Sequence, residues 1–189
     1  MRIIAGRYGG RRLAPVPRRG VRPTADPVRE ALFSILGSSV AGRPFVDLCA
    51  GTGAVGLEAF SRGAAPVVLV ERSREAFSTI RKNLALLGLE PGGDVRAVRA
   101  DVGAWLTGPG PSAIGHAAVI YLDPPWAEER RLARWLAELV ASPLVGPDSL
   151  VIVEHRAGRA PAPPGSWAEA WARRYGDTGL LAMRPAADR

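Results

Sequence analysis

Short apolar runs alternate with helical segments through most of the chain, and this alternation constrains the fold more than any other feature. The apolar runs predict strands at residues 45–49, 67–70, 95–98, 118–122 and 150–153. The segments between them have apolar residues at helical spacing and predict helices at residues 54–62, 74–87, 102–106 and 128–141. Continuous apolar strands separated by helices are typical of a parallel sheet covered on both faces. The sequence therefore predicts an α/β fold whose central sheet is mostly parallel.

Both ends of the chain depart from this pattern. Residues 171–175 and 180–183 predict a C-terminal antiparallel hairpin. At the other end, residues 2–13 predict a small β-hairpin, and a proline- and arginine-rich linker follows. A helix is expected to begin near Asp26, which we predict as its N-cap, and to end at Gly37. We therefore divide the chain into an N-terminal appendage (residues 1–24) and a main domain (residues 25–189).

The net charge of +7 is concentrated near the N-terminus. Residues 1–30 contain eight arginines and two acidic residues, whereas residues 31–153 carry one more acidic than basic residue. A basic segment attached to a nearly neutral body favours a polyanionic partner. Nucleic acid is favoured over a membrane surface, because no basic amphipathic helix accompanies the arginines.

Composition argues against several classes of protein. No apolar run approaches the roughly 20 residues of a membrane-spanning helix, and the first residues lack the apolar centre of a signal peptide. One cysteine and two histidines cannot supply an internal disulfide, a multi-cysteine zinc site or a histidine-rich metal centre. We expect a cytoplasmic protein with no membrane partner and no bound metal.

A glycine-rich turn follows the first predicted strand. Gly51, Gly53 and Gly56 match the G-x-G-x-x-G pattern between a strand and a helix, and Glu71 ends the next strand. A dinucleotide or S-adenosylmethionine could use such a turn, with Glu71 holding a ribose. Asp47 favours S-adenosylmethionine, because that cofactor carries an ammonium and a sulfonium where a dinucleotide carries an anionic pyrophosphate.

Asp101 follows the third predicted strand and is placed to accept a hydrogen bond from an adenine amino group. As a single residue, it is explained equally well as the N-cap of the next helix.

The fourth predicted strand ends in Asp123-Pro124-Pro125-Trp126. The prolines fix the backbone, and ligands of open α/β sheets bind at the carboxyl ends of the strands. The Asp123 carboxylate and the Pro124 carbonyl are suited to accept the two N–H bonds of an exocyclic amine on a base, while Trp126 stacks on the base. By itself the tetrapeptide would be interpreted as a rigid turn. Following a glycine-rich turn and acidic strand ends, it favours an amine-methylating site.

With these motifs the chain resembles the RsmD family, bacterial enzymes that methylate the N2 amine of one guanine in 16S ribosomal RNA. The resemblance runs nearly end to end, and its most specific part combines an Arg-Pro-Thr segment with a Val-Arg-Glu helix. The matching segments lie at residues 2–6, 10–13, 22–33, 47–59, 61–64, 82–84, 123–126 and 175–178, with Glu71. It implies a Rossmann-like class I methyltransferase fold that uses S-adenosylmethionine.

The resemblance also implies a role for individual residues. Contacts to S-adenosylmethionine are implied for Thr24, Asp47, Gly51, Gly53, Glu71 and Asp101. The guanine site is implied for Asp123, Pro124 and Trp126, and RNA binding for Arg7, Arg11, Arg12 and Arg22. This chain departs from the family at Ala25, where a second threonine is usual, at Pro27, where arginine is usual, and at Trp126, where Phe or Tyr is common. The implied substrate lies in an assembled or assembling small ribosomal subunit, and we expect a monomer.

Three alternatives stay open. An amino-methyltransferase that acts on another RNA base or on DNA would use the same amine acceptors, although no segment is long enough for a DNA target-recognition domain. A non-catalytic RNA-binding ribosome assembly factor would keep the basic N-terminus without the chemistry. A dinucleotide oxidoreductase would use the glycine turn, but Asp47 and the short chain count against it.

Overall fold

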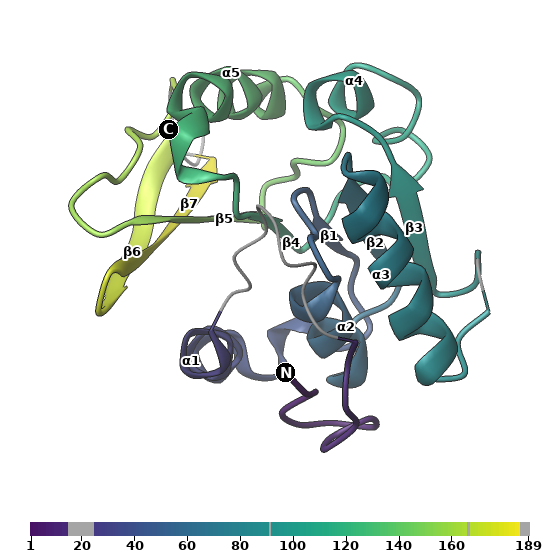
Figure 1. The fold of residues 1–189 in the computed structure, drawn as a ribbon. Coiled ribbons are helices and arrows are strands. Elements are labelled where there is room, and N and C mark those ends of the chain that lie inside the picture. Colours follow the sequence, from purple (N-terminus) through teal and green to yellow (C-terminus); the bar gives the residue numbers. More distant parts are fainter. Residues whose placement is uncertain (15–24, 91, 166, 186–189) are drawn as a thin grey trace.

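The computed structural model describes residues 1–14, 25–90, 92–165 and 167–185 (Figure 1). The helices are α1 (Asp26–Leu36), α2 (Ala54–Ser61), α3 (Arg74–Leu86), α4 (Val102–Leu106) and α5 (Glu129–Val140), with short 3₁₀ turns η1 (Gly37–Val40) and η2 (Trp126–Glu128). The strands are β1 (Phe45–Asp47), β2 (Val67–Glu71), β3 (Val95–Arg99), β4 (Val119–Leu122), β5 (Leu150–Arg156), β6 (Trp167–Tyr175) and β7 (Thr178–Pro185). In the described ranges, no helix combines the length and apolarity of a bilayer span.

One seven-stranded sheet forms the centre of the molecule, in the order β3-β2-β1-β4-β5-β7-β6. The first five strands of this order are parallel, and β7 pairs antiparallel with both β5 and β6. The predicted C-terminal hairpin is therefore confirmed, and it is longer than the sequence indicated. The connection order reverses between β1 and β4, which is the switch point where ligands of such sheets bind.

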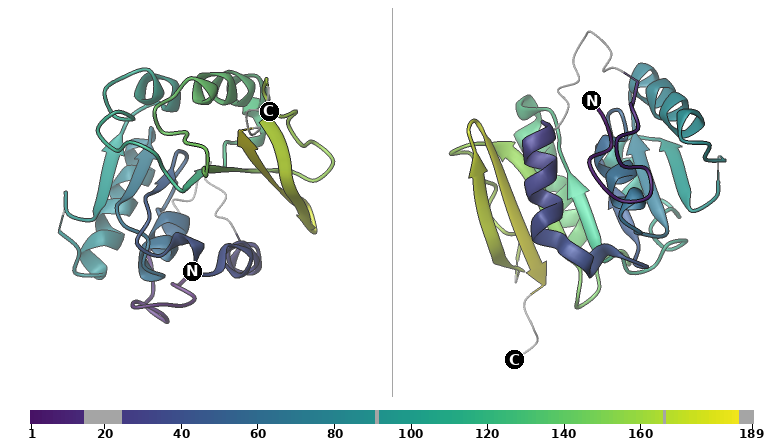
Figure 2. Two further views of the ribbon diagram at one scale, coloured as in Figure 1. Left: turned by 180° about the vertical axis from the view of Figure 1, so that it is seen from behind. Right: turned by 90° about the horizontal axis from the view of Figure 1, so that it is seen from below.

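Helices cover both faces of the sheet (Figures 1 and 2). Apolar residues of α1, α2 and α3 pack on one face, against side chains such as Phe45 and Tyr121. Apolar residues of α4 and α5 pack on the other face, against side chains such as Val46 and Leu122. Neighbouring residues of one strand thus enter opposite cores, because successive side chains of a strand alternate between its faces.

The N-terminal segment (residues 1–14) is integrated into the first of these cores. Ile3 is fully buried, and Leu13 is buried beside it. The Glu58 carboxylate of α2 accepts the backbone N–H groups of Ile4 at 2.7 Å and of Ala5 at 3.1 Å. The small hairpin predicted for residues 2–13 closes through one antiparallel β-bridge, between Arg2 and Arg12. Residues 1–14 therefore pack against α2 and contribute to this core.

Gly6 shows how closely the N-terminal segment lies against α2. Its φ is +82°, and a Cβ atom placed on it would lie 1.9 Å from the backbone oxygen of Ser61. The Ser61 hydroxyl donates to the carbonyl of Ala5 at 2.5 Å and accepts the N–H of Tyr8 at 2.9 Å. Only glycine fits both the left-handed backbone and this close approach.

The start of α1 differs by one residue from the prediction. Ala25 is the N-cap and has extended backbone angles, while Asp26 is the first helical residue. The Asp26 carboxylate pairs with the fully buried Arg29 at 3.1 Å, and Arg29 also donates to the carbonyl of Arg2 at 2.5 Å. Asp26 is therefore engaged with a side chain one turn later, and it does not cap the helix.

Candidate active site

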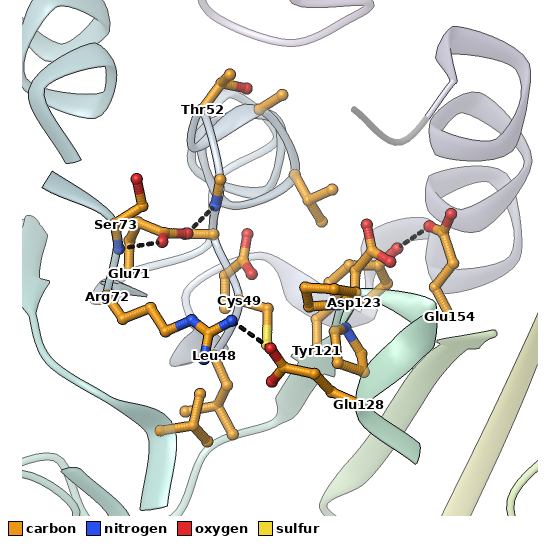
Figure 3. A pocket seen from close by; sticks show the side chains of 18 of the residues that line it. Leu48, Cys49, Thr52, Glu71, Arg72, Ser73, Tyr121, Asp123, Glu128 and Glu154 are labelled. Carbon is orange, nitrogen blue, oxygen red and sulfur yellow. Dashed lines mark hydrogen bonds and ion pairs between the residues drawn. The ribbon is translucent and has the colours of Figure 1, made fainter. Parts of the chain in front are cut away.

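A cavity of about 360 Å³ opens at the carboxyl ends of β1, β2, β4 and β5 (Figure 3). Most of the residues proposed for the site from sequence line it: Asp47, Gly51, Glu71, Asp123, Pro124 and Trp126. Side chains that the sequence did not single out also line it, among them Arg72, Tyr121, Glu128 and Glu154. Because four strands end at one edge, residues up to 107 positions apart in sequence share this space.

The glycine-rich turn is held to the end of β2 by Glu71. One carboxylate oxygen of Glu71 accepts the N–H of Gly51 at 2.8 Å, and the other accepts the N–H of Ser73 at 2.7 Å. Gly51 and Gly53 both have positive φ, and Gly53 is the N-cap of α2 just behind the cavity lining. At Gly56 a Cβ atom would lie 2.2 Å from a methyl carbon of Leu69, so glycine lets α2 pack closely on β2.

Asp47 ends β1 and is buried in the floor of the cavity. The pKa of Asp47 is raised from 3.8 to about 7, chiefly by burial. Hydrogen bonds from the backbone of Cys49 and Gly56 oppose this rise, and the nearby carboxylates of Glu71 and Glu154 add to it. Its Oδ1 atom has no hydrogen-bond partner among the described residues. A positive charge bound in the cavity would supply the missing partner and favour the ionised carboxylate.

Asp123 leaves the end of β4 half-buried, and Pro124 behind it is buried. The turn is closed by the N–H of Glu128, which donates to the carbonyl of Pro125 at 2.8 Å. Trp126 is half-buried on the cavity wall, and the guanidinium of Arg156 lies 5.9 Å from its ring centroid. The segment thus presents a carboxylate and an aromatic ring to the same space.

Tyr121 and Glu154 form a buried pair beside Asp123. The Tyr121 hydroxyl donates to the Glu154 carboxylate at 2.5 Å, and Glu154 is 6% exposed (Figure 3). Leu122 of β4 pairs with Val153 of β5, and the next residue on each strand, Asp123 and Glu154, lines the cavity. Sequence reasoning missed this pair, although an acidic residue at the end of an apolar strand was the available signal.

Asp101 is not among the residues that line the cavity. Its Oδ1 accepts the N–H of Gly103 at 3.0 Å as the N-cap of α4, and its Oδ2 pairs with Arg131. Burial raises the pKa of Asp101, but the hydrogen bond and charge of Arg131 outweigh it and lower the pKa overall. Arg131 also pairs with Glu128 at 3.1 Å, and Glu128 pairs with Arg72 across the cavity. A contact of Asp101 with adenine remains a proposal that requires sharing its carboxylate with Arg131.

Cys49 lines the cavity as a neutral thiol. Desolvation raises its pKa well above the ordinary value, and the carboxylates of Asp123, Asp47 and Glu71 raise it further. A thiol that stays protonated is a poor nucleophile. Cys49 therefore contributes packing beside the cavity and no covalent chemistry.

The arginines proposed to bind RNA are not among the residues that line the cavity, and Arg22 lies outside the described residues. Arg7, Arg11 and Arg12 are exposed on the N-terminal segment. The backbone N–H of Arg7 donates at 2.7 Å to the carbonyl of Ser61, at the end of α2 that is remote from the cavity. Arg22 and Thr24 fall outside the described residues, and their proposed roles stay predictions.

The chain is similar to one protein family and to two named relatives. The family model described as "Conserved hypothetical protein 95" matches residues 1–184. The Bacillus subtilis (strain 168) protein with the name "Putative rRNA methyltransferase YlbH" is 33% identical over 181 residues, which cover 95% of this chain and 96% of that protein. The "Ribosomal RNA small subunit methyltransferase D" of Escherichia coli (strain K12) is 39% identical over 127 residues, which cover 67% of this chain and 60% of that protein.

A solved structure has the same architecture. "Putative methyltransferase yhhF from Escherichia coli" superposes with a TM-score of 0.84 at 32% identity, covering 100% of this chain and 99% of that chain. Together with the strand order, this likeness confirms the predicted Rossmann-like class I methyltransferase fold.

Proposed function

Because the chain belongs to the RsmD family, whose model matches residues 1–184, we propose that it methylates the N2 amine of one guanine in 16S ribosomal RNA. The methyl donor in this proposal is S-adenosylmethionine. Relatives whose names describe ribosomal RNA methyltransferases support the class of substrate. The choice of the N2 amine rests on the acceptors at the end of β4.

S-adenosylmethionine fits the residues of the cavity. The unpartnered Oδ1 of Asp47 suits the cationic methionyl end, and the ionised form of this carboxylate gains a counter-charge there. Glu71 accepts one backbone N–H on each oxygen, and each oxygen keeps a lone pair for a ribose hydroxyl. When bound, the cofactor supplies an electrophilic methyl group on its sulfonium.

Asp123 and Pro124 then orient the amine. The Asp123 carboxylate and the Pro124 carbonyl accept the two N–H bonds, so the nitrogen lone pair is turned out of the ring system and toward the methyl group. Trp126 stacks on the base, and Asp123 stays within reach of the proton that the amine must lose. Positioning of this kind can contribute about 7–11 kcal/mol to catalysis.

The observation that carries the proposal is the single cavity shared by these groups. Acceptors for a cationic cofactor follow β1 and β2, acceptors for an amine follow β4, and both sets line one space. We propose that the protein acts as a monomer. We propose an assembled or assembling small subunit as the substrate, with the guanine flipped out of its stack at a cost of a few kcal/mol.

Asp123→Asn tests the assignment of the amine acceptor. Asparagine keeps the shape of the side chain but replaces an acceptor oxygen with an N–H₂ donor, which faces the N–H bonds of the amine. We expect methyl transfer to small subunits to fall by at least about 100-fold, with cofactor affinity in calorimetry within about threefold of wild type. Asp148→Asn, an exposed residue outside the cavity lining, is the matched control. Unchanged turnover in the Asp123 variant would contradict the role.

Mapping methylated nucleotides in 16S ribosomal RNA from cells with and without the gene tests the substrate. The proposal predicts that N2 methylation disappears at one guanine and returns on complementation. Loss of a methyl group from another amine would favour the alternative amino-methyltransferase. An unchanged methylation pattern, with ribosome assembly impaired, would favour the non-catalytic assembly factor.

A further inference from the structure

Arg7 lies at the end of α2 that is far from the cavity. Its backbone N–H donates to the carbonyl of Ser61, the last residue of α2, whereas α2 begins after the glycine-rich turn of the cavity. A contact with RNA at Arg7 therefore does not account for RNA on the β5 side of the cavity.

A second group of arginines lies near the edge of the sheet at which the cavity opens. β5 ends at Arg156, which pairs with Thr178 at the start of β7. The turn between β6 and β7 therefore projects from the edge of the sheet at which β4 and β5 end. Arg156 and Arg173 are exposed here, and Asp177 is the sole acidic residue between positions 170 and 185.

The strand registers place Arg173 in line with Glu154 of the cavity lining. Glu154 pairs with Leu180, and Leu180 pairs with Arg173. Residues paired in this way project from the same face of the sheet, and neighbouring strands are about 4.8 Å apart. Arg173 therefore lies two strands, about 10 Å, from Glu154 on the same face of the sheet.

Arg156 and Tyr175 form the next row on that face. Both pair with Thr178, one from each side, and Arg156 also lies over the Trp126 ring. The turn is fixed to the end of β5, because the N–H of Ala157 donates to the carbonyl of Asp177 at 2.8 Å. Tyr175 is half-buried against the core, so its ring has a defined position.

We propose that Arg156, Arg173 and Tyr175 form an RNA-binding surface, the hairpin surface, for the strand that flanks the target guanine. This inference rests on the proposed function. Guanidinium groups neutralise phosphates, and alternating aromatic rings stack on unpaired bases, which is the combination used for single-stranded nucleic acid. An acidic protein partner would need only the arginines for binding, without the aromatic rings. The aromatic rings beside them and the adjoining cavity favour RNA.

Arg173→Ala and Arg174→Ala provide a matched test. Both arginines are exposed on β6, and each bonds a local backbone carbonyl through its guanidinium. Arg174 pairs with Gly179 and projects from the opposite face of the strand. We expect Arg173→Ala to weaken binding of unmodified 16S ribosomal RNA and to lower the slope of log affinity against log salt by about 0.7, the value for one phosphate contact on a single strand.

The expected pattern has two further parts. Arg174→Ala leaves both the affinity and the salt slope unchanged, and Arg156→Ala combined with Arg173→Ala lowers the slope by about 1.4. Cofactor affinity stays at the wild-type value in every variant, which reports an intact fold. Equal salt slopes for wild type and the double variant would overturn the hairpin surface, even where wild type methylates the RNA. Absence of methyl transfer by wild type would instead overturn the proposed function.

Discussion

The buried carboxylate of Asp47 makes the stability of the ligand-free protein depend on pH. Burial raises the pKa of Asp47 to about 7, whereas an unfolded chain has an ordinary value near 3.8. The folded state therefore holds a proton that the unfolded state has lost between these two values. Its contribution to stability is complete below about pH 4, falls as the pH rises toward 7, and is constant above that.

The size of this effect follows from the shift. Each pKa unit corresponds to about 1.4 kcal/mol, so a shift of about three units amounts to about 4 kcal/mol. Asp47→Asn removes the titration and keeps the shape of the side chain. We expect the free energy of unfolding of the variant, minus that of wild type, to rise by about 4 kcal/mol between pH 4 and pH 8.

Urea unfolding at pH 4, 6 and 8 measures this difference, because titrations shared by the two proteins cancel in it. A difference that stays constant over this range would refute the assignment of the raised pKa to Asp47. At pH 8 Asp47→Asn should affect cofactor binding in the opposite direction from its effect on stability. The variant cannot offer a negative charge to a cationic ligand, so we expect its affinity for S-adenosylmethionine to fall by at least about tenfold.

Two further predictions concern stability. Gly6→Ala should destabilise the protein by at least about 2 kcal/mol more than Gly10→Ala in thermal unfolding, because both glycines have φ of +82° but only Gly6 faces the backbone of Ser61 at contact distance. An equal loss of stability in the two variants would mean that the N-terminal segment can move away from Ser61 without an energetic cost. Tyr121→Phe should lower the free energy of unfolding by about 1–3 kcal/mol, because it leaves the buried Glu154 without its hydroxyl donor. Unchanged stability in urea titration would exclude this contribution.

The layout of the sheet and much of the cavity could be predicted from sequence, for a simple reason. Each parallel strand is a continuous apolar run, and the residue that follows it is carried to a common edge of the sheet. Asp47 and Glu71 end their strands and Asp123 directly follows its strand, so their presence in one cavity follows from the strand pattern. No knowledge of side-chain packing was needed for this step.

Contacts between elements distant in sequence could not be predicted in this way. Asp101 matches a helix N-cap and an adenine acceptor equally well, and only the approach of Arg131, 30 residues later, shows that its second oxygen is engaged. The link from Tyr121 to Glu154 spans 33 residues and depends on the register of β4 against β5. Periodicity identifies a strand, but it does not fix which residue of a neighbouring strand lies beside it.

The attachment of residues 1–14 to α2 has a consequence for biosynthesis. The backbone N–H of Ile4 has its acceptor on Glu58, 54 residues further along the chain. During translation residues 1–14 therefore leave the ribosome before the helix that holds them has been made. Their docking is a late event, which follows the formation of α2.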